Sequence, residues 1–341
     1  MGLSVTALYR FPPLALPYES FDLSREGARV PALLAQLHDP VHWQQSYNFG
    51  WTQRGLAQAL RWRMLIPVVA HDLRLTDRQY LWLPWVGSFI LLALVGWYAW
   101  RSSHDVIKFA ATVGLFVTSS AWSSGIWGLG CMDPFYLVGL LLVSFSPSPL
   151  AVLAACLFCP WIDERFLLAL PLCAALRGTD GRGWWWPLLG VLPYCGVRLA
   201  ALLAGDTGIS DQIAMQGAAF WRFAIWLPIG WWHGWRAAWP LIVLALILVW
   251  HRESRLGRWL LASGVACLLV IYFLAWDSSR SIAVLLPFMV YGVSRFTSRP
   301  WVLCLLVALN FILPTTFVTA TRSPTGEIVP SAASTRTTWF S

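Results

Sequence analysis

Residues 79–100, QYLWLPWVGSFILLALVGWYAW, contain no charged side chain and few polar ones. As an α-helix, a stretch of this length rises about 33 Å, which is enough to cross a hydrocarbon core of about 30 Å. Thr76 and Gln79 have the Thr-x-x-Gln spacing of a capping box, in which each side chain satisfies a backbone N–H at the start of a helix. The stretch therefore predicts a transmembrane helix that begins close to residue 79.

The composition of the whole chain extends this prediction. Of its 341 residues, 58% are hydrophobic and only 12% are charged, unlike a soluble globular domain. Apolar stretches recur from Gln79 to Val318 and predict an all-α, polytopic integral membrane protein with about 8–10 transmembrane or half-membrane helices. The formal charge of +8 comes from scattered arginines rather than a basic patch, so we expect no nucleic-acid partner. The expected parts are an extracytoplasmic or interfacial amphipathic preamble (1–78), a transmembrane helical domain (79–320) and a polar C-terminal tail (321–341).

The central helices are expected to be short. Asp133-Pro134 and Ser148-Pro149 each combine an N-cap residue with a proline suited to the first helical turn. The apolar runs that follow rise about 18 Å as helices, so we expect a re-entrant hairpin or the wall of a water-filled cavity. A third helix is expected to begin at Asp163. The other expected spans are 106–122, 184–204, 235–250, 257–276, 279–293 and 301–318, and apolar stripes at 30–37 and 56–64 predict helices lying on the membrane surface.

Basic residues gather in alternate loops, which predicts the orientation of the chain. If the spans alternate, the loops at 101–108, 177–182, 252–258 and 295–299 share one face, and basic loops favour the cytoplasm. The opposite face then receives the acidic segments. We therefore expect the functional site on the extracytoplasmic side.

Charged residues beside apolar stretches are the candidate site residues, although each has a simpler structural interpretation. Asp163, Glu164 and Arg165 in WIDERF either cap a helix and pair locally, or accept a proton from a substrate and bind a phosphate. Asp277 and Arg280 are three residues apart, so they either form a local pair at a turn or contribute to the same site.

Three isolated charged residues have two interpretations each. Asp133 is better interpreted as a helix cap than as a catalytic carboxylate. Arg63 suits anionic lipid headgroups and a substrate phosphate equally well. Arg198 lies inside an expected span, where it must extend to the interface or face a cavity.

The Cys156-x-x-Cys159 pair has neither a second pair nor nearby histidines, so we expect no metal ligands. The sequence leaves open whether a divalent metal is a cofactor.

Three stretches resemble small bacterial members of the GT-C superfamily of membrane glycosyltransferases. They are RWRMLIPVV (61–69), DPFYLVGLLLVSFSPSPLAVLAACLFCPWIDERFLLALPL (133–172) and WDSSRSIAVLLPFMV (276–290). In that superfamily a short helix initiated by Asp, an acidic-Arg pair that opens the next helix, and a late arginine follow in this order. The resemblance implies transfer of a sugar from a polyprenyl-phosphate-linked donor to a cell-surface glycan or lipid acceptor, in contact with membrane lipid, on the outer face of the bacterial cytoplasmic membrane.

The resemblance also implies roles for individual residues. Asp22, with Glu19 as the alternative, would deprotonate the acceptor, and Arg165 and Arg280 would bind the departing phosphate. Neighbouring carboxylates would orient these arginines or contact the acceptor. The catalytic candidates are thus Asp22, Glu19, Asp163 and Glu164, and the substrate-binding candidates are Arg63, Arg165, Asp277, Arg280 and Asp133.

Two other functions fit the same residues. A transporter or flippase of lipid-linked sugars needs a polar path through the membrane, for which Asp133 and Arg198 are the candidates. In a non-enzymatic membrane assembly subunit, the polar turns would serve only as caps and anchors.

Overall fold

Helix α6 (Asp77–Ser103) begins at the predicted capping box. The Thr76 side chain accepts a hydrogen bond from the backbone N–H of Gln79, and the Gln79 side chain accepts one from the N–H of Thr76 at 2.9 Å. At the other end, His104 terminates the helix in the left-handed conformation, with φ of 48°. The capping box is therefore confirmed, and α6 extends beyond each end of the predicted span by less than one helical turn.

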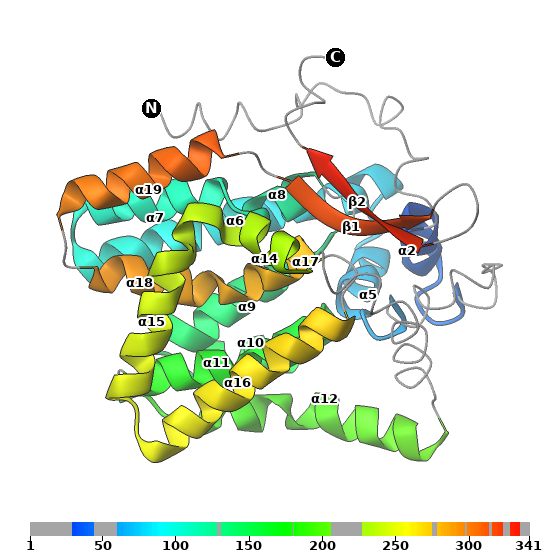
Figure 1. Cartoon of the computed structure of the whole chain (residues 1–341). Helices are drawn as coiled ribbons and strands as arrows, with labels where there is room; N and C mark the ends of the chain where they lie inside the picture. The colour runs from blue at the N-terminus through cyan, green and yellow to red at the C-terminus, as the bar shows by residue number, and fades with distance from the viewer. Residues whose placement is uncertain are drawn as a thin grey trace.

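The computed structural model describes the chain as a set of packed helices followed by a short hairpin (Figure 1). The described residues are 29–43, 60–127, 131–179, 181–205, 227–274, 278–296, 299–313, 316–322 and 328–334. Besides α6, the helices are α2 (Arg29–His38), α5 (Leu65–Asp72), α7 (Val106–Val117), α8 (Ser120–Trp127), α9 (Asp133–Phe145), α10 (Pro149–Phe158), η3 (Cys159–Trp161), α11 (Arg165–Gly178), α12 (Trp185–Leu203), α14 (Leu227–Trp235), η4 (Arg236–Ala238), α15 (Trp239–Arg252), α16 (Arg255–Leu274), α17 (Ser278–Ser281), η5 (Ile282–Leu285), α18 (Leu286–Arg295) and α19 (Pro300–Ile312).

The short central helices are confirmed and lie in the middle of the assembly. Ser148 caps α10 by accepting a hydrogen bond from the N–H of Ala151 at 3.3 Å, with Pro149 in the first turn as predicted. Helix α9 packs against both α6 and α11, whereas α10 packs against α12 and α11 against α16 (Figure 1). Helix α15 packs on α18, and α19 packs on α7.

Two apolar cores hold these helices together. The larger core unites α6 to α11 with α15, α16 and α18. The smaller core joins Leu33 and Leu37 of α2 to Leu60 and to Tyr80 and Leu81 at the start of α6. The apolar stripe of α2 therefore packs on the protein at the start of α6, where the sequence suggested a helix lying on the membrane surface.

Three of the described helical stretches are long and apolar enough to cross a membrane, and a fourth qualifies if α7 and α8, bent by 53°, are taken together. The three are 77–103, 185–203 and 228–252; the shorter apolar helices are 133–145, 149–161 and 300–312. Half or less of the most apolar 18-residue part of each of the three is buried: 44% in 77–103, 22% in 185–203 and 50% in 228–252. Such a surface is typical of helices that face lipid.

The C-terminal part departs from the predicted all-helical architecture. Helix α19 ends at Ile312, and strands β1 (Thr316–Arg322) and β2 (Ile328–Ser334) pair antiparallel, with Thr316 opposite Ser334. The predicted span 301–318 is thus too long, and the boundary at 320 between the transmembrane domain and the tail falls inside a strand. Strand β1 contains three Thr, a Phe and a Val, strand β2 begins with Ile-Val, and Pro and Gly occur in the intervening SPTGE segment, which together favour a hairpin.

Candidate functional site

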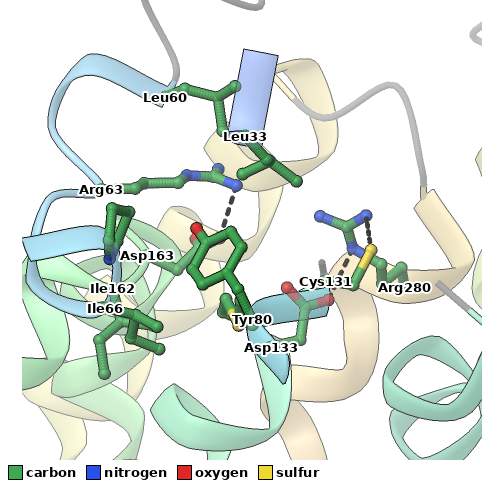
Figure 2. Close-up of a pocket in the computed structure, with 12 residues that line it drawn as sticks. Leu33, Leu60, Arg63, Ile66, Tyr80, Cys131, Asp133, Ile162, Asp163 and Arg280 are labelled. Carbon is green, nitrogen blue, oxygen red and sulfur yellow. Dashed lines mark hydrogen bonds and ion pairs between the residues drawn. The ribbon is translucent and has the colours of Figure 1, made fainter. Parts of the chain in front are cut away.

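Five charged side chains from four separate segments meet in a group that we call the arginine–aspartate cluster. Arg63 precedes α5, Asp133 lies in the first turn of α9, and Arg280 belongs to α17. Asp163 and Arg165 come from the turn that opens α11. Figure 2 shows Arg63 directed at Asp163 and Arg280 directed at Asp133. The structure therefore brings together five of the nine predicted site residues.

Arg165 lies at the centre of the cluster. Its Nε and Nη2 donate to Oδ1 and Oδ2 of Asp163 at 2.9 and 2.8 Å, the two-point geometry of a strong arginine–carboxylate pair. The same Nη2 donates to Oδ1 of Asp133 at 2.7 Å, and the guanidinium lies 5.2 Å from the centre of the Tyr136 ring. The side chains of Arg165, Asp133 and Asp163 are only 9%, 3% and 3% exposed. These three charges are consequently solvated mainly by one another.

Arg63 and Arg280 complete the cluster and are more exposed than Arg165. Nη1 of Arg63 lies 3.1 Å from Oδ2 of Asp163, and Nε of Arg280 lies 2.6 Å from Oδ2 of Asp133. Nη1 of Arg280 also donates to Sγ of Cys131 at 3.3 Å. Nε of Arg63 is buried and makes no hydrogen bond within the described part of the chain. Three guanidinium groups thus share two carboxylates, and one of them keeps a spare donor.

The backbone that carries Arg63 is fixed by α2. The amide of Gln36, which is fully buried, donates to the carbonyl oxygens of Leu60 and Arg63 at 3.1 and 3.3 Å. These two contacts tie residues 60–63 to α2, so the position of the Arg63 side chain depends on the packing of the preamble.

The predicted N-cap role of Asp133 is wrong. Met132 occupies the N-cap position of α9 without a capping hydrogen bond, and Asp133 lies inside the first turn with a proline beside it. Its carboxylate instead accepts from Arg165 and pairs with Arg280. Two guanidinium partners attract a buried carboxylate more strongly than a backbone N–H does.

Asp163 both caps a helix and takes part in the arginine–aspartate cluster, so both interpretations of the WIDERF stretch apply to it in part. Its Oδ1 accepts from the backbone N–H of Arg165 at 2.9 Å, which is the predicted capping contact, although α11 begins at Arg165 rather than at Asp163. Burial raises the pKa of Asp163, but the charges of Arg165 and Arg63 outweigh burial and hold it well below the usual range. A carboxylate that is so firmly ionised is a weak proton acceptor. Asp163 is therefore suited to positioning arginines.

Glu164 faces a different set of partners from its neighbour Asp163. It accepts a hydrogen bond from the hydroxyl of Tyr194 at 3.1 Å, and Nη2 of Arg198 lies 3.2 Å from its Oε1. The Arg198 guanidinium also lies 4.2 Å from the centre of the Trp62 ring. Arg198, predicted to extend to the interface or to face a cavity, is thus held in a cation–π contact and an ion pair beside the cluster.

A small pocket adjoins the cluster (Figure 2). Its volume is about 40 Å³, room for about three water molecules. One part of its wall is polar and the other apolar. The polar part consists of Arg63, Tyr80, Cys131, Asp133, Asp163 and Arg280, and the apolar part of Leu33, Leu60, Ile66, Pro67, Met132 and Ile162.

Three predicted site residues, Glu19, Asp22 and Asp277, lie outside the described residues. Within the described ranges, no three His, Cys, Asp or Glu side chains are grouped closely enough to hold a metal ion. The two carboxylates of the cluster are occupied by guanidinium groups, so this donor set suits an anionic ligand better than a cation.

Sequence reasoning missed two residues on the polar part of the pocket wall, Tyr80 and Cys131. Tyr80 is the fourth residue of α6 and Cys131 precedes α9 in a run of apolar residues, so neither stands out by charge or spacing. Their importance comes from tertiary contacts that no local pattern encodes.

Comparisons with known proteins identify no relative of this chain. No protein-family model matches the chain, and neither a curated protein nor a solved structure shows significant similarity to it.

Proposed function

We propose that this chain is an integral membrane glycosyltransferase that moves a sugar from a polyprenyl-phosphate donor to a cell-surface glycan or lipid, at the outer face of the bacterial cytoplasmic membrane. The observation that carries the proposal is the spare, buried donor of Arg63 beside a pocket whose other cations are already held in place. In glycosyl transfer from a lipid phosphate, negative charge develops on the departing phosphate. Fixed guanidinium groups at that point stabilise the transition state without having to reorganise.

The carboxylates of the cluster support this chemistry indirectly. Asp133 and Asp163 hold Arg280, Arg165 and Arg63 at fixed positions through contacts of 2.6 to 3.1 Å. Preorganisation of this kind is what a site needs to stabilise charge on a leaving group. The base that deprotonates the acceptor must then be another carboxylate. The candidates are Asp22 and Glu19, as the resemblance implies, and Glu164 beside the cluster.

The arrangement of basic turns supports an outward-facing site. Lys108, in the first turn of α7, donates to the carbonyl of Ser294 near the end of α18 at 3.0 Å. Arg252 at the end of α15 also reaches α18, through the hydroxyl of Tyr291 at 3.4 Å. These contacts lie at the ends of α6 and α18 that are remote from Tyr80 and Arg280. Since basic turns favour the cytoplasm, the cluster would face the other side.

Turnover of a lipid-linked donor tests the proposal. The purified chain in lipid is incubated with a panel of polyprenyl-phosphate sugars and a membrane glycan extract, and free polyprenyl phosphate is measured. We expect release by the wild type and a loss of about 10²–10³-fold in kcat for Arg63→Met, because one leaving-group donor is removed. Arg61→Met is the matched control, since Arg61 is exposed and absent from the pocket wall.

Two results would overturn the proposal. A folded wild type that releases no polyprenyl phosphate from any donor is not a transferase of this kind. Equal loss in the Arg61 and Arg63 variants would mean that the pocket is not the site. In the first case, flux of a lipid-linked sugar across proteoliposomes, compared between wild type and Arg198→Met, would separate a transporter from an assembly subunit.

A further inference from the structure

The hydroxyl of Tyr80 is a buried donor that no other described residue satisfies. Tyr80 is 0% exposed, and within the described residues its hydroxyl makes no hydrogen bond. Its side chain lines the pocket and, in the view of Figure 2, is drawn between Arg63 and Asp163 on one side and Asp133 on the other. A buried polar group is normally hydrogen-bonded, and an exception calls for a physical explanation.

A second unsatisfied donor borders the same space. Nε of Arg63 is buried and has no hydrogen-bond partner among the described residues, and Arg63 lines the pocket together with Tyr80. Both carboxylates on the pocket wall, Asp133 and Asp163, form ion pairs with arginines. Two donors on the wall of one cavity, neither with an acceptor among the described residues, point to an acceptor supplied by a ligand. A guanidinium and a hydroxyl together suit the oxygens of an oxyanion.

The size and the remaining wall of the pocket narrow the class of ligand. A volume of about 40 Å³ holds about three water molecules, which is the scale of one phosphate group and too little for a sugar ring. The rest of the wall consists of apolar side chains, among them Leu33, Leu60 and Ile66. Apolar surface next to an anion site suits a hydrocarbon chain attached to the phosphate.

We propose that Tyr80 is a ligand-binding residue whose hydroxyl donates a hydrogen bond to a phosphate oxygen of a lipid monophosphate, while Arg63 binds the same group and the apolar wall takes the first part of the lipid chain. The inference rests on the proposed function for the choice of a lipid phosphate as ligand. It adds a residue that binds the phosphate group directly.

A direct binding measurement tests this role. Farnesyl phosphate is titrated calorimetrically into the full-length chain in phosphatidylcholine nanodiscs, with farnesol and inorganic phosphate as comparison ligands. We expect the wild type to bind farnesyl phosphate more tightly than either comparison ligand. Tyr80→Phe should weaken binding of farnesyl phosphate by about tenfold or more, the usual effect of losing a hydrogen bond to a charged group, and should leave farnesol binding unchanged.

The stability of the empty protein separates binding from folding. Because Tyr80→Phe removes a hydroxyl that has no hydrogen-bond partner among the described residues, the variant should unfold at the same temperature as the wild type or higher. Tyr98→Phe is the control: Tyr98 lies further along α6 and is not part of the pocket wall, so this variant should bind farnesyl phosphate like the wild type.

Three outcomes would overturn the inference: binding by Tyr80→Phe within about twofold of the wild type, an equal loss for farnesol, or no preference of the wild type for farnesyl phosphate over farnesol. Failure of the proposed function gives a different pattern. If binding depends on Tyr80 but no sugar is transferred, the proposed transferase function is wrong and the lipid-phosphate site stands. If sugar is transferred equally well by the wild type and Tyr80→Phe, the transferase function stands and the role of Tyr80 is wrong.

Discussion

Replacing Arg165 by methionine tests whether the arginine–aspartate cluster holds the fold together. Methionine keeps an unbranched side chain that can still contact the Tyr136 ring, but it removes the guanidinium that bridges Asp133 and Asp163. Both carboxylates are then left in a site where they are only 3% exposed. Water cannot readily replace the lost partner.

The contacts set the size of the expected effect. Removing one member of a buried ion pair costs about 3–5 kcal/mol. Arg63 and Arg280 remain in the variant, each still facing one carboxylate at 3.1 and 2.6 Å. We therefore expect a loss near the lower limit, about 3 kcal/mol. Arg198→Met is the matched change: its partner Glu164 is 32% exposed, so water can solvate the carboxylate and the loss should be about 1 kcal/mol or less.

Unfolding in mixed micelles measures both variants. Sodium dodecyl sulfate is titrated into the protein in dodecylmaltoside, and unfolding is followed by the fluorescence of its 24 tryptophans. We expect the Arg165 variant to unfold at a clearly lower detergent fraction than the Arg198 variant. If the two variants differ by less than about 1 kcal/mol, Arg165 is not the centre of a buried ion network, and the reasoning fails.

Three further predictions test individual features. The pKa of Asp163 is lowered in the folded protein, so its contribution to stability is complete above about pH 4 and is lost as the pH falls further. At pH values below about 4, the detergent fraction at the unfolding midpoint should therefore decrease, and it should decrease less in Asp163→Asn. A Cβ at Gly292 would meet the Leu241 carbonyl, so Gly292→Ala should lower the melting temperature, whereas Gly196→Ala, with no atom within 4 Å, should raise it slightly. Thr76→Ala should cost about 1 kcal/mol in the same detergent titration, because the capping box is lost.

Local signals predicted the helices well and the C-terminal part poorly. The capping box at Thr76 and the Ser148-Pro149 cap depend on residues at most three positions apart, and both are confirmed. The end of α19 depends on a competition between continuing an apolar helix and pairing strand 316–322 with strand 328–334. Hydropathy records only the first of these, because the pairing partner lies further along the chain.

The same distinction explains what could be predicted of the site. Asp163 and Arg165 stood out because charges beside apolar stretches are costly to keep there. The error about Asp133 has the opposite origin: an Asp-Pro pair at a helix start indicates a cap locally, whereas its real partners lie 32 and 147 positions further on, at Arg165 and Arg280. Tyr80 gave no signal, since its role depends on a missing hydrogen-bond partner rather than on residue type.

The energetics of the cluster give a reason for the charges in WIDERF. A buried ion network is commonly no more stabilising than apolar side chains of the same volume, so stability alone does not require five charges at this position. What apolar side chains could not do is hold Arg63 and Arg280, from segments more than 200 residues apart, against one pocket with fixed geometry. Asp163 and Asp133 each hold one of these arginines, and Arg165 keeps the two aspartates together. On this argument Arg165 acts on the ligand through its neighbours, so Arg165→Met should weaken binding of farnesyl phosphate by displacing Arg63 and Arg280, whereas Tyr80→Phe should weaken it without any loss of stability.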